Sequence, residues 1–209
     1  MSPSNKRNRI FLLSPANAGG ERARLLLRDR ANFDLAVKLR TEGAALGEVF
    51  SFISGLYFRG KLAYAEAFSA APAGMPGSFV IAAGRGLVPP ETHVTLDELQ
   101  RIADIPVDAA ERRYREPLER DARILAELAG PDCGVILLGS IATAKYMEPL
   151  VDIFGERLLF PAEFVGRGDM GRGGLMLRCA RAGTELTYVP AVSATRRGPR
   201  APKLPRIPR

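Results

Sequence analysis

The side chains best suited to chemistry lie in one glycine-dense stretch, residues 159–175 (LFPAEFVGRGDMGRGGL). It combines three glycines at G-x-G-x-x-G spacing with two arginines and one aspartate, namely Gly166, Gly168, Gly171, Arg167, Arg172 and Asp169. Glycine lets an anion approach the backbone closely, and a guanidinium group binds phosphate through paired hydrogen bonds. The stretch predicts an anion-binding loop in which Asp169 orients a polar group of the ligand. The alternative is a flexible turn whose arginines are merely solvated. A dinucleotide fingerprint is disfavoured, because the motif follows a late strand and no acid stands about 20 residues further on.

Three earlier loops also follow apolar runs, at residues 14–20, 84–90 and 139–145. If these runs are parallel strands, the three loops and residues 161–174 gather at one edge of a sheet, where α/β proteins bind their ligands. Besides Gly166, Arg167, Gly168 and Arg172, the loops contribute these ligand-binding candidates: Ser14, Asn17, Gly19, Gly20, Arg85, Ser140, Thr143 and Lys145. Ser140, Thr143 and Lys145 either hold a phosphate or cap a helix. Arg85 either touches the ligand or only follows a glycine turn.

Asp169 and Glu163 are the catalytic candidates, because they are the carboxylates nearest to the glycine-dense stretch and a carboxylate can act as a general acid or base. His93 is the sole histidine, which excludes a histidine-rich metal site and favours a capping or packing role. The chain has no G-x-x-x-x-G-K-[ST] motif. We predict neither a metal nor a cofactor.

The pattern of residues 56–68 is helical, with Tyr57, Lys61 and Tyr64 on one stripe. In one interpretation, Tyr57, Arg59 and Lys61 project toward the ligand edge. In the other, Tyr57 and Tyr64 pack against the sheet. The packing interpretation is favoured.

Alternating strands and helices are expected from the hydrophobic pattern. Apolar runs predict strands at residues 9–13, 78–83, 133–138, 157–160 and 185–189. Thr95 and Glu98 form a capping box at a helix start, Pro117 divides a later long helix into two pieces, and a last helix spans residues 175–182. This alternation predicts a three-layer, doubly wound α/β fold with a mostly parallel sheet of four to five strands.

The net charge of +7 belongs to the ends of the chain. Residues 195–209 contain no acid and six bases: Arg196, Arg197, Arg200, Lys203, Arg206 and Arg209. Proline recurs there every third residue, which indicates a polyproline-II helix whose bases form one stripe and contact nucleic-acid phosphates. The alternatives are docking in an aromatic groove, folding back on the domain, or disorder. We therefore divide the chain into a flexible N-terminus (1–8), a single α/β domain (9–194) and a basic tail (195–209).

Two features predict a cytoplasmic protein with no membrane contact. Cys133 and Cys179 are the only cysteines and are expected to be buried free thiols. No stretch approaches the ~20 apolar residues of a membrane span, and the apolar run near the N-terminus is too short for a signal peptide.

Five motifs together resemble a known type of domain: LLSPANAGGERA, SGLYFRGKLAYA, IAAGRGLVPP, GSIATAKYMEPL and FPAEFVGRG. This set, over about residues 9–175, resembles a family of small bacterial α/β domains. It is also similar to the second domain of archaeosine-type tRNA-guanine transglycosylase relatives, which looks like uracil-DNA glycosylase. The resemblance implies a three-layer glycosylase-like fold and a nucleobase or nucleic-acid context.

Glycosylase chemistry does not follow from the resemblance. The loop after the first strand offers Asn17 and no acid, and His93 lies mid-chain rather than after a late strand. The leading hypothesis is a protein that binds nucleic acid or a nucleotide at the carboxyl edge of the sheet, as a binder or as a nucleobase-processing enzyme. The alternatives are an enzyme acting on a phosphorylated small molecule and a non-catalytic module that binds a partner through the tail.

Overall fold

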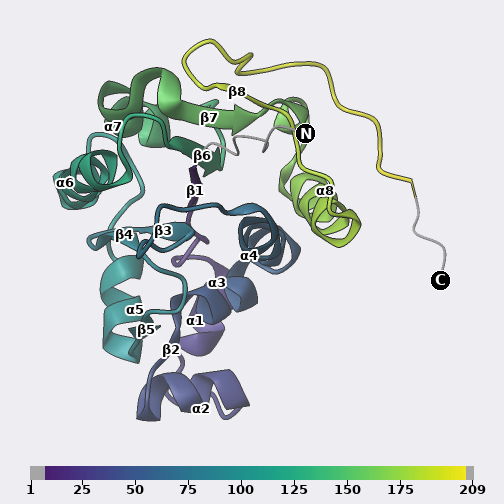
Figure 1. The fold of residues 1–209 in the computed structure, drawn as a ribbon. Helices are drawn as coiled ribbons and strands as arrows, with labels where there is room; N and C mark the ends of the chain where they lie inside the picture. Colours follow the sequence, from purple (N-terminus) through teal and green to yellow (C-terminus); the bar gives the residue numbers. More distant parts are fainter. Residues whose placement is uncertain (1–7, 206–209) are drawn as a thin grey trace.

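A mixed six-stranded sheet runs through the centre of the computed structural model, which describes residues 8–205 (Figure 1). The strand order is β4-β3-β1-β6-β7-β8. The strands span Arg9–Leu13 (β1), Ser78–Ala82 (β3), Gly86–Val88 (β4), Gly134–Leu138 (β6), Leu158–Pro161 (β7) and Tyr188–Pro190 (β8). The four central strands are parallel, and β4 and β8 run antiparallel at the two edges. The predicted α/β fold with a mostly parallel sheet is confirmed.

The central strands are parallel because they are apolar on both faces. Residues 10–13 of β1 and 135–138 of β6 are fully buried. They pair in register, with Phe11 opposite Ile136 and Leu13 opposite Leu138. A strand without a polar face needs helices on both sides of the sheet, which is the usual setting of parallel strands.

The predicted number of four to five strands was too low. Residues 84–90 do not form a loop between a strand and a helix, because Gly84 and Gly86 take positive φ angles of 75° and 80° and reverse the chain into the β3-β4 hairpin. The last strand begins at Tyr188 rather than at residue 185, and it pairs antiparallel with β7. A short second sheet pairs β2 (Ala44–Ala45) with β5 (His93–Val94).

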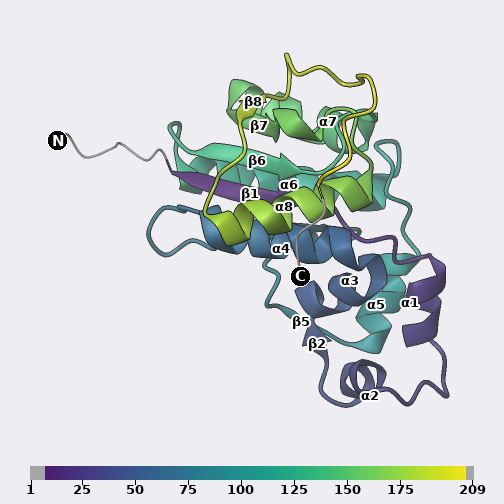
Figure 2. The same ribbon diagram turned by 90° about the vertical axis from the view of Figure 1, so that its right-hand side faces the viewer.

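Eight α-helices accompany the sheet in residues 8–205. They span Glu21–Leu26 (α1), Asp34–Thr41 (α2), Leu46–Ser54 (α3), Leu56–Phe68 (α4), Leu96–Ala103 (α5), Arg112–Ala129 (α6), Ala144–Phe154 (α7) and Asp169–Ala182 (α8), and 3-10 turns occupy Gly155–Arg157 and Ala162–Phe164. Helices α4 and α8 lie on one side of the sheet and α6 and α7 on the other (Figure 1). Figure 2 shows α1, α2, α3 and α5 gathered beyond the end of the sheet at which β1 terminates.

Helices α4 and α8 lie in direct contact because each contributes a glycine at their crossing. A Cβ on Gly60 would come within 2.7 Å of the Gly173 carbonyl oxygen, and a Cβ on Gly173 within 2.7 Å of the Leu56 carbonyl oxygen. The predicted start of the last helix at residue 175 was therefore wrong. The glycines were interpreted as a loop signal, but Gly171, Gly173 and Gly174 are helical and Gly173 serves the close packing of two backbones.

Two further helix predictions had different outcomes. The capping box is confirmed, because the Thr95 hydroxyl accepts from the Glu98 amide and the Glu98 carboxylate accepts from the Thr95 amide. The division at Pro117 was wrong, since α6 is continuous over 18 residues. Its buried face and the i,i+4 pairs of Glu119 with Arg115 and Arg123 hold the helix together across the proline.

Within residues 8–205, no helix is both long enough and apolar enough to cross a membrane.

Candidate functional site

A cavity of about 450 Å³ lies beyond the carboxyl ends of β1 and β6. One wall is formed by residues 14–19 after β1 and by Ser140, Lys145 and Tyr146 after β6. Asp169 at the start of α8 and Tyr57 on α4 also line it, and residues 102–107 at the end of α5 close the opposite side. The volume lies in the range of small-molecule sites, which is about 300–1,000 Å³.

The cavity sits where the winding of the sheet reverses. The chain passes from β1 to its neighbour β3 on one side, and then crosses to β6, the neighbour of β1 on the other side. The loops after β1 and β6 therefore diverge and leave a crevice between them, which is the usual ligand position in open α/β sheets. Gly139 keeps the two strand ends close, because a Cβ there would come within 2.9 Å of Ser14 Cβ.

Ser14 and Lys61 form a buried pair at the base of this crevice. Lys61 Nζ donates to Ser14 Oγ at 2.7 Å and to the Ser14 carbonyl oxygen at 2.8 Å. Ser14 Oγ also lies 3.2 Å from the Leu138 carbonyl oxygen, which accepts its hydrogen bond. The Lys61 side chain is fully buried, and Ser14 separates it from the cavity that Ser14 lines.

Burial lowers the pKa of Lys61 to about 7. The charge of Asp169 opposes this shift, whereas Arg172 and Lys145 add to it. Within residues 8–205, no carboxylate lies within ion-pair distance of Lys61; its ammonium group instead lies 3.9 Å from the ring centre of Tyr57. An amine with this pKa exchanges protons near neutral pH, as a general base must.

Two tyrosines complete the wall around Ser14. Tyr57 and Tyr146 are buried and both line the cavity. Burial raises the pKa of each phenol, so both remain protonated hydrogen-bond donors at neutral pH. Among the described residues, the buried Tyr57 hydroxyl makes no hydrogen bond of normal geometry, although the Arg172 and Ser14 side chains lie close enough to lower its pKa. An unpaired buried hydroxyl is uncommon and suggests that a ligand or a water supplies its partner.

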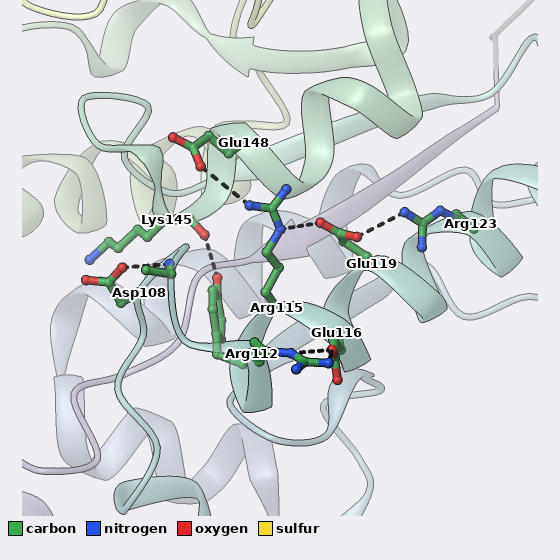
Figure 3. Close-up of polar contacts among 10 residues, drawn as sticks. Asp108, Arg112, Arg115, Glu116, Glu119, Arg123, Lys145 and Glu148 are labelled. Atoms are coloured by element: carbon green, nitrogen blue, oxygen red, sulfur yellow. Dashed lines mark hydrogen bonds and ion pairs between the residues drawn. The ribbon is translucent and has the colours of Figure 1, made fainter.

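Lys145 provides a cation at the cavity from the first turn of α7. Its backbone carbonyl accepts a hydrogen bond of 2.8 Å from the Tyr114 hydroxyl on α6. Arg115 on α6 bridges Glu119 and, at 3.6 Å, Glu148 on α7 (Figure 3). These contacts fix the start of α7 relative to α6. The Lys145 side chain, whose Nζ lies 5.1 Å from the Tyr146 ring centre, adds a positive charge at the first turn of the helix. That arrangement favours an anionic group.

The structure brings together some of the predicted site residues. Around the cavity lie Ser14, Asn17, Gly19, Ser140, Lys145 and Asp169. The other candidates of the domain do not line it, namely Gly20, Arg85, Thr143, Glu163, Gly166, Arg167, Gly168 and Arg172. Of the two catalytic candidates, only Asp169 faces the cavity, as the exposed first residue of α8.

The two arginines of the glycine-dense stretch bind backbone carbonyl groups. Arg172 donates to the Phe164 carbonyl oxygen at 3.2 Å and 3.3 Å. Arg167 donates to the carbonyl oxygens of Glu163 and Pro202, each at 3.0 Å. The Glu163 carboxylate accepts from the Thr187 amide at 2.9 Å. These three side chains hold the segment between β7 and α8 in place, so a direct ligand contact would require them to exchange partners.

Arg85 is paired with Glu98 across 2.8 Å, from the β3-β4 turn to α5. Thr143 precedes α7 but its side chain makes no capping hydrogen bond. His93 is an exposed residue of β5, rather than a cap or a packed side chain.

Both cysteines, Cys133 and Cys179, are buried and unpaired. Within residues 8–205 no cluster of three or more histidine, cysteine, aspartate or glutamate side chains could hold a metal.

The predicted nucleic-acid contacts of the tail lie partly outside the described residues. Arg196, Arg197, Arg200 and Lys203 are exposed. Arg206 and Arg209 fall beyond residue 205.

The sequence interpretation missed Tyr146. It considered that Tyr57 and Lys61 project toward the ligand edge but favoured packing of the tyrosines, so neither residue was among the ligand-binding candidates. A signal for Lys61 was present, since a lysine shares a helical stripe with two tyrosines that were expected to pack. A charged residue on a buried stripe is uncommon unless it has a function. Tyr146 carried no comparable signal.

Comparisons with protein-family models, with curated proteins and with solved structures find no match for this chain.

Proposed function

We propose that this protein binds a small phosphorylated molecule of about nucleotide size in the cavity between β1 and β6. The observation that carries this proposal is the position of Lys145, which lines a cavity at the switch point of the sheet from the first turn of α7. A lysine beside unpaired helix amides is a common phosphate site. Arg172 adds positive charge near the cavity, and the Asp169 carboxylate in the cavity wall offsets part of it.

A nucleotide is the ligand of this class that we favour. Asp169 and Asn17, both exposed at the cavity, could accept and donate hydrogen bonds to a sugar or a base. The resemblance of the strand-loop motifs to glycosylase-like domains supports a nucleobase, and a three-layer glycosylase-like arrangement remains part of this proposal. A cavity of about 450 Å³ suits a single nucleotide better than a duplex.

Isothermal titration calorimetry with the four ribonucleoside monophosphates tests this function. The full chain is expected to bind at least one of them in a saturable manner, and Lys145→Gln to bind it about 10- to 100-fold more weakly through loss of one charge-assisted hydrogen bond. The matched control is Lys38→Gln, because Lys38 is a surface lysine paired with Glu48 far from the cavity. Absence of binding to every monophosphate, or equal affinity of the Lys145 and Lys38 variants, would exclude the proposed site.

A second candidate function rests on the tail. Its six bases without an acid favour sequence-independent contact with nucleic-acid phosphates. This function does not need the cavity, and it predicts that oligonucleotide binding is lost with the tail and is unaffected by Lys145→Gln.

A further inference from the structure

We propose that Ser14 and Lys61 form a catalytic dyad in which Ser14 Oγ is the nucleophile and Lys61 Nζ its base, and that the pair hydrolyses a carboxylic ester of the phosphorylated ligand. The phosphorylated part of the substrate rests on the proposed function, since the same cavity would hold the phosphate at Lys145. The nucleophile itself is argued from the geometry around Ser14.

The geometry of the pair is that of a nucleophile and its base. Lys61 Nζ donates to Ser14 Oγ at 2.7 Å, and the Ser14 hydroxyl donates to the Leu138 carbonyl oxygen. When the amine is neutral, the hydroxyl has to turn from Leu138 toward Nζ, which lies within the range required for proton transfer. Ser14 lines the cavity, whereas Lys61 lies behind it and is sealed from solvent. A ligand in the cavity would therefore meet the serine first, and the amine would exchange protons only with groups that come to the Oγ position, 2.7 Å from Nζ. Serine activated by lysine is one of the arrangements that replace the serine-histidine pair.

The groups facing Lys61 come from three helices. Tyr57 and Phe58 on α4 present their rings to the ammonium group, at 3.9 Å and 5.3 Å from the ring centres. Asp169 and Arg172 on α8 and Lys145 on α7 are the nearby charges. Burial is the main cause of the lowered pKa of Lys61; the charge of Asp169 opposes it, and those of Arg172 and Lys145 add to it. The neutral amine is therefore available to accept a proton near neutral pH.

The buried donors beside Ser14 would serve the negative charge that develops on a carbonyl oxygen. Tyr57 lines the cavity, and its buried hydroxyl lies near Ser14 and Arg172 without a hydrogen bond of normal geometry to any described residue. The backbone amides of Ala16 and Ala18, two buried residues that line the same cavity, donate no hydrogen bond to any group in residues 8–205. Donors left unpaired in a preorganised site are suited to stabilising an oxyanion.

The reaction proceeds in two steps, acylation of Ser14 and hydrolysis of the acyl-serine. Neutral Lys61 takes the proton of Ser14 as Oγ bonds to the ester carbonyl carbon; the ester C–O bond then breaks, and the leaving alkoxide receives that proton. Water next attacks the acyl-Ser14 ester, Lys61 accepts a proton from the water, and the proton passes to Ser14 Oγ as the acid is released. The net reaction is hydrolysis of the ester to an acid and an alcohol.

A fluorophosphonate probe tests the dyad, because the serine oxygen displaces fluoride from phosphorus and intact-mass spectrometry detects the adduct. Trypsin releases residues 10–22 as one peptide, in which Ser14 is the sole hydroxyl residue. We expect a single adduct on this peptide of the full-length protein. The labelling rate should rise with pH through about 7 and then level off, because Lys61 acts in its neutral form.

Matched variants separate catalysis from structure. Ser193→Ala removes an exposed serine that does not line the cavity and should leave labelling unchanged. Ser14→Ala should abolish it. Lys61→Arg keeps a cation and Lys61→Met keeps the length of the side chain, and both should slow labelling by about 100-fold or more, without the rise through pH 7. Labelling of Lys61 variants at the wild-type rate, in proteins that melt cooperatively, would overturn the role of the lysine.

Two further outcomes distinguish the dyad from the proposed function. If the wild-type protein gains no adduct on residues 10–22 although a nucleoside monophosphate binds, the dyad is wrong and the proposed function stands. If Ser14 is labelled but no monophosphate binds or slows the labelling, the nucleophile stands and the phosphorylated substrate class is wrong. Labelling of Ser14 that a bound monophosphate slows supports both.

Discussion

Lys61 lies in an unusual environment for a lysine. Its ammonium group is fully buried, its hydrogen bonds go to one serine, and its neighbours are aromatic rings. Burial in apolar surroundings disfavours the charged form of an amine, and a pKa of about 7 is the consequence. A site of this kind reduces the stability of the folded protein whenever the amine must carry its proton.

The pH dependence of stability should reveal this lysine. Between pH 7 and about 10.5 the unfolded chain keeps the Lys61 proton that the folded protein has released, so the free energy of unfolding rises with pH in this window. The gain is at most about 1.4 kcal/mol per pH unit. The Lys61→Met variant lacks this gain in the free energy of unfolding. All other titrating groups are common to the variant and the wild-type protein, so the difference between their slopes is due to Lys61. Urea unfolding at pH 7, 8 and 9 measures the difference in slope; parallel curves would show that Lys61 titrates normally.

At the scale of single residues, the sequence predicts where Ser14 lies but not that Lys61 contacts it. Ser14 and Ser140 directly follow apolar strands, so their place at the ligand edge could be predicted from the order of the elements. Lys61 comes from a helix 47 positions further on, and its contact with Ser14 depends on how α4 packs against β1. No local spacing encodes that contact.

Among the elements, the crossing of α4 and α8 controls the shape of the site. Gly173→Ala should lower the free energy of unfolding by about 1–3 kcal/mol, because its Cβ would lie 2.8 Å from the Tyr57 Cα and 2.7 Å from the Leu56 carbonyl oxygen. The control is Gly171→Ala in the same helix, whose nearest neighbour is Arg167 Cβ at 3.8 Å. That variant should be neutral or stabilising by up to about 1 kcal/mol. Chemical denaturation compares the two, and equal effects would contradict the close-packing role of Gly173.

Helix α5 carries one side of the cavity, and its capping box sets where it begins. Thr95→Ala removes the hydroxyl that accepts from the Glu98 amide and should lower the free energy of unfolding by about 0.5–2 kcal/mol. Thr95→Ser keeps the acceptor and is the matched control. Thermal unfolding of the two variants provides the measurement, and an alanine variant as stable as the serine variant would show that the cap is dispensable.

Elements with a local signal were predicted well, and those defined by distant contacts were not. The helix at 56–68 and the capping box at Thr95 follow from periodicity and from a short motif. The start of α8 was missed because glycine usually marks a loop, whereas Gly173 is there to admit the backbone of α4. The β3-β4 hairpin was missed because its turn resembles a strand end followed by a loop.

At the scale of the whole molecule, the charge is separated between a nearly neutral body and a basic C-terminal end. If the tail binds nucleic-acid phosphates, deletion of residues 195–209 should weaken binding of a single-stranded oligonucleotide and flatten its dependence on salt concentration. Fluorescence anisotropy at several salt concentrations measures both, and Lys145→Gln in the full-length chain is the control. An unchanged affinity and slope would remove the tail from nucleic-acid binding.

The position of the site followed from topology, and its composition did not. A parallel α/β sheet could be predicted from alternating apolar runs and helical patterns, and with it the edge at which the loops after β1 and β6 meet. The residues that give the cavity its chemical character come from helices that pack beside that edge. Their identity depends on three-dimensional packing, which the order of elements leaves open.

We propose above all that a phosphorylated ligand occupies the cavity between β1 and β6, and one measurement tests its position directly. Hydrogen-deuterium exchange of the full-length protein, with and without a nucleoside monophosphate, maps the contact without any mutation. We predict slower exchange of amides in residues 14–20 and 139–147, with little change in β5 and in α2. Protection confined to residues 166–174 or to the tail, or none in any peptide at saturating nucleotide, would contradict the assignment.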